Sequence, residues 1–138
     1  MISLIIGNKG SGKTKRLVEL VNAAVDSSNG NVVCIEKGLK LTYDLTHKAR
    51  LVDSDEYGIT DYDALFGFIC GMFAGNYDLT DLFVDATLRI GGRDYEKLAD
   101  FIERLSAVCE KANAKVTFTV SCDENDLPAR IFNFANKI

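Results

Sequence analysis

LIIGNKGSGKT, residues 4–14, is the most informative stretch of this 138-residue chain. Its first three residues form a short, continuous apolar run, which is typical of a strand covered on both faces of a sheet. Residues 7–14 then match the spacing G-x-x-x-x-G-K-S/T in full. From Lys13 to Ser27 apolar residues recur at helical spacing, with polar residues on the other face. The sequence therefore predicts a strand, a glycine-rich loop and a surface helix in direct succession.

This loop has the chemistry of a phosphate-binding site. Glycines let the chain curl around phosphate oxygens without a Cβ in the way, so that several backbone N–H groups can point at one anion. The helix that follows adds its unpaired N–H groups and the positive end of its dipole. Lys13 is placed to reach the β and γ phosphates, and the Thr14 hydroxyl to ligate Mg²⁺. We therefore expect the nucleotide-binding residues to be Gly7, Asn8, Lys9, Gly10, Ser11, Gly12, Lys13 and Thr14.

The rest of the chain alternates between strands and helices. Short apolar runs predict strands at 32–35, 82–84 and 116–120, and helical periodicity predicts helices at 62–74 and 94–113. Strands joined by helices form parallel pairs with right-handed crossovers. We expect an α/β protein, a single nucleotide-binding domain over 1–138, with three layers (α/β/α) and a mostly parallel central sheet.

Three further segments carry weaker signals. Alternation of apolar and polar residues predicts a β-hairpin over 39–53. Apolar residues at helical spacing behind Pro128 predict a terminal helix packed on the core. Glycines four residues apart share one face of the helix at 62–74, which favours close packing of that face on the sheet; they are Gly67, Gly71 and Gly75.

Composition and charge exclude several classes of protein. The formal net charge of −4 argues against a nucleic acid partner. The four cysteines are scattered and have no neighbouring histidine, so we expect reduced core thiols rather than a zinc site or disulfides. The apolar amino terminus lacks the basic flank of a signal peptide, which favours the cytoplasm, and no apolar run is long enough to span a membrane.

On residues 7–14 and on 82–85, the chain resembles P-loop NTPases. The resemblance makes the loop the Walker A motif and the strand ending at Asp85 the Walker B motif, so that Asp85 would hold Mg²⁺ together with Thr14. Many ATPases of this superfamily follow that aspartate with a glutamate, whereas Ala86 follows here. The RecA-like branch instead places its glutamate at the end of the strand after the loop's helix. Glu36 stands in the similar place, and the resemblance implies that it orients or deprotonates the attacking water. Lys13 is the other residue for which the resemblance implies a catalytic role.

The same resemblance suggests roles for three polar residues near the predicted strand ends. Ser121 corresponds to a polar sensor near the γ phosphate, or it is a strand-end serine in a local turn. Arg89 and Arg93 lie in a glycine-containing loop that could move over a bound nucleotide, or they are solvated surface residues. The lone His47 is expected in a surface turn.

The resemblance implies binding of ATP or another NTP with Mg²⁺, but it leaves the reaction open. The first alternative is a small ATPase or nucleotide-driven switch with slow hydrolysis, acting on a protein partner or as a homo-oligomer. The chain also resembles small bacterial ATP-binding proteins labelled as twitching-motility relatives. The second alternative for the reaction is a nucleoside-type kinase that resembles thymidine kinases in layout. The third alternative is a sensor that binds nucleotide without turnover. A GTPase is disfavoured because no N-K-x-D stretch follows the later strands.

Overall fold

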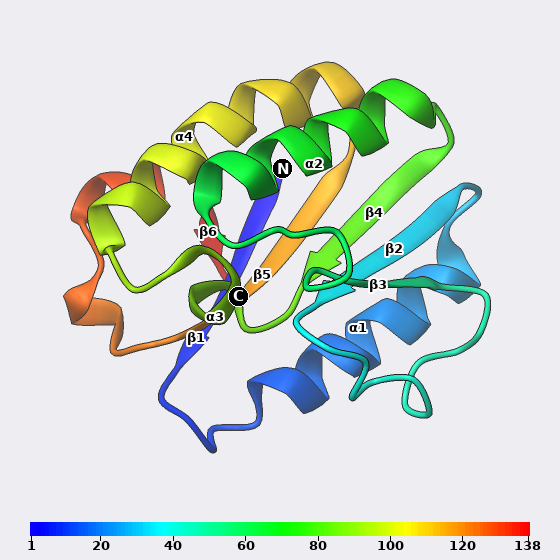
Figure 1. The fold of residues 1–138 in the computed structure, drawn as a ribbon, viewed down its shortest axis with the longest axis horizontal. Coiled ribbons are helices and arrows are strands. Elements are labelled where there is room, and N and C mark those ends of the chain that lie inside the picture. The colour runs from blue at the N-terminus through cyan, green and yellow to red at the C-terminus, as the bar shows by residue number, and fades with distance from the viewer.

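Six strands form one parallel sheet in the order β3-β2-β4-β5-β1-β6, in a computed structural model that describes residues 1–138 (Figure 1). Every pair of neighbouring strands is parallel, so the expected α/β class with a parallel sheet is confirmed. The strands are β1 (Ile2–Gly7), β2 (Asn31–Glu36), β3 (Arg50–Asp53), β4 (Leu79–Val84), β5 (Lys115–Ser121) and β6 (Asn136–Lys137).

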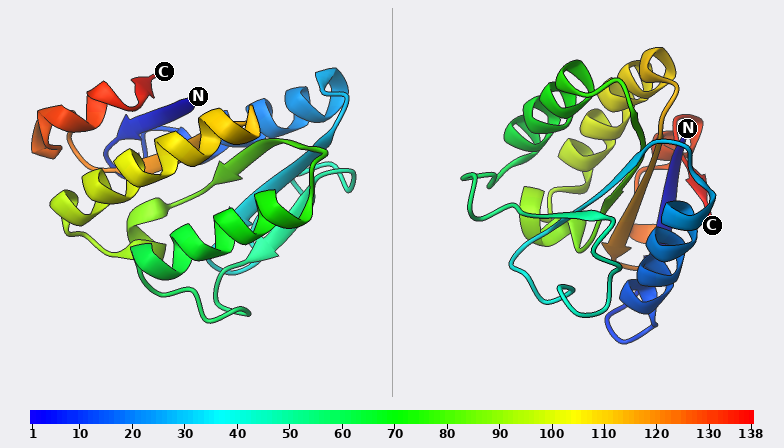
Figure 2. Two further views of the ribbon diagram at one scale, coloured as in Figure 1. Left: turned by 90° about the horizontal axis from the view of Figure 1, so that it is seen from above. Right: turned by 90° about the vertical axis from the view of Figure 1, so that its right-hand side faces the viewer.

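Helices cover both faces of this sheet. Helix α1 (Lys13–Ser27) lies on one face, and α2 (Tyr62–Gly75) and α4 (Tyr95–Ala112) lie side by side on the other (Figures 1 and 2). The short helix α3 (Thr87–Gly91) follows β4 directly. The helices predicted from the sequence at 13–27, 62–74 and 94–113 therefore form at the expected places.

The sheet separates two hydrophobic cores, because successive side chains of a strand point to opposite faces. On β1, Leu4 packs into the larger core under α2 and α4, whereas Ile5 packs into the smaller core under α1. On β4, Val84 belongs to the larger core and Phe83 to the smaller. Strands buried on both faces explain why the sequence shows continuous apolar runs there.

The predicted β-hairpin at 39–53 is wrong. Only its second half is a strand, β3, and β3 pairs with β2 in parallel, with Val33 opposite Arg50. In the first half, the Leu45 N–H donates to the Leu41 carbonyl, which makes one helical turn. Both leucines are buried in the core under α1, while Tyr43 between them is 98% exposed. The apolar spacing that resembled alternation is the spacing of one buried turn.

The predicted carboxy-terminal helix is also wrong. Two short 3₁₀ helices, Glu124–Asp126 and Ala129–Asn133, replace it, and β6 then pairs with β1 at the edge of the sheet. Leu127 and Pro128 have extended ψ angles of 140° and 131°. The residue before a proline is disfavoured from the helical region, which explains the break at Leu127. Leu127 and Ile131 still pack into the larger core, as expected.

The glycine face of α2 does not pack on the sheet. Leu65, Ile69 and Phe73 make the buried face. Gly67, Gly71 and Gly75 lie two residues further along in each turn, which places them on the opposite, exposed side. No atom lies within 4 Å of where a Cβ would stand on any of these glycines. The favoured interpretation of a close helix–sheet contact is therefore incorrect.

All four cysteines are free thiols, as expected. Cys34, Cys109 and Cys122 are buried, and burial raises the pKa of Cys109 to about 11, which keeps it protonated at neutral pH. Cys70 is only partly buried. His47 lies in an exposed turn, as expected. No helix combines the length and the apolar character needed to cross a membrane.

Candidate functional site

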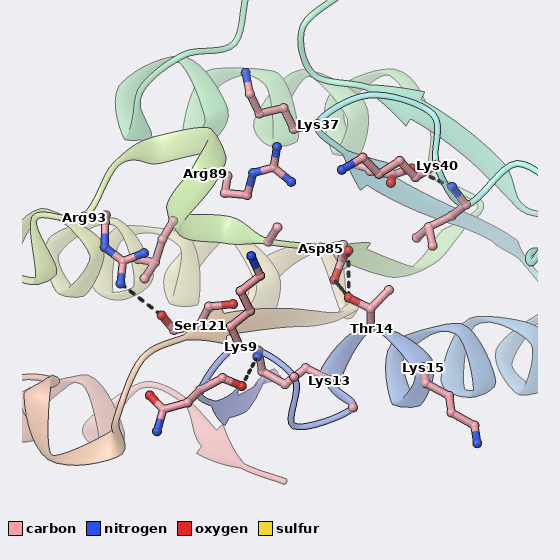
Figure 3. A pocket seen from close by; sticks show the side chains of 17 residues that line it. Lys9, Lys13, Thr14, Lys15, Lys37, Lys40, Asp85, Arg89, Arg93 and Ser121 are labelled. Carbon is pink, nitrogen blue, oxygen red and sulfur yellow. Dashed lines mark hydrogen bonds between the residues drawn. The ribbon is translucent and has the colours of Figure 1, made fainter.

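A cleft of about 1140 Å³ lies at the carboxyl ends of the central strands. The chain leaves β2 toward β3 at one edge of the sheet and leaves β4 toward β5 on the other side, although β2 and β4 are neighbours. Diverging connections open a crevice at such a point, and open α/β sheets bind ligands there. The residues that follow β1, β2 and β4 and the end of β5 line this cleft (Figure 3).

The glycine-rich loop forms the floor of the cleft. Gly10 and Gly12 have φ angles of +87° and +83°, a left-handed conformation that glycine adopts without steric cost. The Ser11 N–H donates to the Asn8 carbonyl at 3.1 Å, which closes a tight turn. The backbone N–H groups of Lys9, Gly10 and Gly12 have no partner within the chain. Unpaired donors directly before a helix N-terminus suit an anion.

Lys13 bends back over this loop. Its Nζ donates to the Asn8 carbonyl at 3.0 Å and lies 3.5 Å from Ser11 Oγ. The side chain is 8% exposed. A buried ammonium group held mainly by a neutral carbonyl is only partly compensated. An anion seated in the loop would complete its hydrogen bonding and balance its charge.

Asp85 connects three elements through its carboxylate. The Thr14 hydroxyl, at the start of α1, lies 3.3 Å from both carboxylate oxygens. Thr119, on β5, donates to Asp85 Oδ1 at 2.7 Å and in turn accepts from the Ala86 N–H at 2.7 Å. The carboxylate is 6% exposed and remains at the edge of the cleft. A hydroxyl and a carboxylate side by side are oxygen donors of the kind that Mg²⁺ prefers.

The backbone is strained directly after Asp85. Ala86 has φ 53° and ψ 53°, a left-handed conformation that costs a non-glycine residue about 1–2 kcal/mol. The Ala86 N–H donates to the Thr119 hydroxyl. The Ala86 carbonyl accepts from the Arg89 N–H at 2.9 Å, at the start of α3. This sharp turn ends β4 and carries the chain along the rim of the cleft.

Glu36 ends β2 and lines the same cleft. Its Oε2 accepts from the Leu41 N–H at 3.2 Å, and the residue is 4% exposed. Burial raises the pKa of its carboxyl and nearby Asp85 raises it further, whereas the hydrogen bond from Leu41 partly offsets both. A carboxyl with a raised pKa lies closer to the range in which it can take a proton from water.

The cleft is strongly basic in a chain whose net charge is −4. The only acidic side chains lining it are Glu36 and Asp85. Seven basic side chains line it: Lys9, Lys13, Lys15, Lys37, Lys40, Arg89 and Arg93. A concave surface with this excess of positive charge attracts anions.

The structure brings most of the sequence-predicted site residues together. The loop, Glu36, Asp85 and Ser121 meet at one cleft, although Gly7 and Ser11 support the loop without lining it. Arg89 stands on helix α3 rather than in a loop, which corrects that part of the expectation. Arg93 donates to the Ser121 carbonyl at 3.2 Å, so both residues sit at the rim.

Sequence reasoning missed Thr119, Lys37 and Lys40. Thr119 is a polar residue in a buried strand, and a partner 34 residues earlier in the chain explains it. Lys37 and Lys40 follow the carboxyl end of β2. Their position after a central strand was the signal that could have assigned them to the cleft.

We expect Thr119→Val to lose about 1–3 kcal/mol of unfolding free energy, because it leaves the Ala86 N–H without an acceptor and removes the shorter of the two hydrogen bonds to Asp85 Oδ1. Urea unfolding measures this loss. Thr117→Val is the matched control, since Thr117 is buried on the same strand and its side chain makes no hydrogen bond. Equal losses in both variants would show that the hydroxyl of Thr119 has no special role.

We expect Glu36→Gln to stabilise the fold at neutral pH. The folded-state pKa of the carboxyl is raised, so the stability that the protonated group contributes is present at low pH and is lost as pH rises through that pKa. Glutamine keeps an acceptor for the Leu41 N–H without the charge. Urea unfolding should show a gain over the wild type at about pH 7 that shrinks toward about pH 4. A gain independent of pH would contradict this origin.

No protein-family model matches this chain, and no curated protein matches its sequence.

Proposed function

We propose that this chain is a P-loop nucleotide-binding protein that binds ATP with Mg²⁺ in the cleft and hydrolyses it slowly. One observation carries the proposal: the glycine-rich loop, with its unpaired N–H groups and the Lys13 ammonium, lies directly before α1 and next to the Thr14–Asp85 pair. Phosphate oxygens and Mg²⁺ need donors and oxygen ligands of these two kinds, close together. The two layers of helices around a parallel sheet fit the three-layer fold of such proteins.

Thr14 and Asp85 are the residues that would hold Mg²⁺. Mg²⁺ keeps several waters and is usually bound through one or two carboxylates together with substrate phosphates. Two protein oxygen donors next to a phosphate-binding loop fit that requirement. Thr119 would act as a positioning residue, because its hydrogen bond fixes the rotation of the Asp85 carboxylate. When bound, the metal neutralises charge on the β and γ phosphates.

Glu36 is the residue we assign to the attacking water. It lines the cleft, one of its carboxylate oxygens accepts from the Leu41 N–H, and burial raises its pKa. No other acidic side chain except Asp85 lines the cleft. One carboxylate, tied to the backbone, is consistent with slow rather than rapid turnover.

ATP is the nucleotide we assign, because the chain lacks the N-K-x-D stretch that reads guanine. The protein would then act as a small ATPase or nucleotide-driven switch. A kinase that transfers the phosphoryl group to a small acceptor is the second candidate. It is favoured by the basic residues that line the cleft but lie outside the glycine-rich loop, because they could bind an acceptor or the transferred group. A sensor without turnover is the third. Product analysis separates the three candidates: an ATPase releases free phosphate, a kinase yields a phosphorylated acceptor, and a sensor yields neither.

We expect Lys13→Ala to weaken ATP binding about tenfold or more, because it removes the ammonium group that faces the loop. Calorimetric titration with a non-hydrolysable ATP analogue and Mg²⁺ measures the change. Arg16→Ala is the control, since Arg16 is an exposed cation one turn further along α1 and outside the cleft. Unchanged binding in Lys13→Ala would refute the loop as the phosphate site.

We expect Glu36→Gln to lower the rate of phosphate release about a hundredfold while leaving the affinity for the ATP analogue unchanged. Glu19→Gln, on the exposed face of α1, is the control. Phosphate release under single-turnover conditions is the measurement. An unchanged rate would remove Glu36 from the reaction, and no release by the wild type would favour the sensor.

A further inference from the structure

Arg89 and Lys40 face each other across the upper part of the cleft, on the far side of Asp85 from the glycine-rich loop (Figure 3). Arg89 extends from α3, after β4, and Lys40 from the turns after β2. Neither side chain makes an ion pair or a hydrogen bond. Two unpaired cations that point at one space repel each other unless an anion lies between them.

The backbone holds both residues in place. On one side, the Tyr62 hydroxyl donates to the Gly92 carbonyl at 2.7 Å, and its ring packs against Gly91, which fixes the end of α3. On the other side, the Leu41 N–H is bound by Glu36 and the Leu41 side chain is buried. Cations on anchored segments lose less entropy when they bind an anion than cations on free loops do.

Arg89 and Lys40 follow other strands of the sheet than the glycine-rich loop does. The loop follows β1, whereas the pair stands above β2 and β4, and β5 separates β4 from β1. With neighbouring strands about 4.8 Å apart, the carboxyl end of β1 is about 12 Å from the midpoint between the ends of β2 and β4. The loop's N–H groups and the Arg89–Lys40 pair therefore lie on opposite sides of the Thr14–Asp85 contact (Figure 3).

We propose that the phosphoryl group of a second small molecule, distinct from the loop-bound nucleotide, binds between Arg89 and Lys40. The inference rests on the proposed function, because it assumes that the nucleotide occupies the loop. The guanidinium of Arg89 presents a planar fork that matches two phosphate oxygens, and the ammonium of Lys40 reaches a third. The cleft, at about 1140 Å³, exceeds the usual size of about 300–1,000 Å³ for one small ligand.

The test is a titration with inorganic phosphate in the presence of Mg²⁺ and a saturating non-hydrolysable ATP analogue. We expect the wild type to bind one phosphate in addition to the analogue. Arg89→Gln and Lys40→Gln should each weaken phosphate binding about tenfold and leave the affinity for the analogue unchanged. Lys48→Gln, which removes an exposed cation from the same β2–β3 connection but outside the cleft, should change neither.

In this titration two results would overturn the proposal: no phosphate bound once the analogue is present, or a loss of analogue affinity in Arg89→Gln and Lys40→Gln. Either would mean that the pair contacts the nucleotide itself. If the chain binds no nucleotide at all, the proposed function fails separately. The Lys13→Ala chain without nucleotide then tests the second site, since its phosphate binding should still depend on Arg89. Independence from Arg89 there would also overturn the proposal.

Discussion

The carboxylate of Asp85 is the interaction on which the geometry of the cleft depends. It accepts from Thr119 on β5 and lies beside the hydroxyl of Thr14 on α1, so one side chain connects β4 to both elements. Thr119 also binds the N–H of Ala86 and thereby stabilises the strained turn into α3. Because these contacts share atoms, their free energies are coupled rather than additive. This hydrogen-bond network thus fixes the groups at the carboxyl ends of β4 and β5 relative to the start of α1.

The net charge of the chain does not indicate the basic character of the cleft. The chain is acidic as a whole, yet the cleft is lined by seven basic and two acidic side chains. The basic residues come from the loop after β1 and the first turn of α1, from the segment after β2, and from α3 and the residues just after it. They converge only because parallel strands bring their carboxyl ends to one edge of the sheet. Topology, rather than composition, concentrates the positive charge.

Local signals explain which parts of the structure could be predicted from the sequence. The strand, loop and helix over residues 2–27 and the capped helix α4 are specified by nearby residues, such as Asp94, which accepts from two N–H groups of the first turn. The failures involve distant partners. Whether β3 pairs in parallel with β2, and whether the tail adds a strand to β1, is decided by the exposed edges of the sheet, which no local pattern records. Thr119 was missed for the same reason, because its partner Asp85 is 34 residues away.

Glu36 ties the chemistry of the cleft to the segment that carries its basic residues. The carboxylate that we assign to water activation is the same group that binds the Leu41 N–H next to Lys40. The positive charge of Lys40 lowers the pKa of Glu36, so an anion that neutralises Lys40 would raise that pKa and make Glu36 a stronger base. The reverse also holds, since a protonated Glu36 no longer competes with an anion for the charge of Lys40. In this arrangement the occupancy of the proposed second anion site and the reactivity of Glu36 are thermodynamically linked through the charge of Lys40.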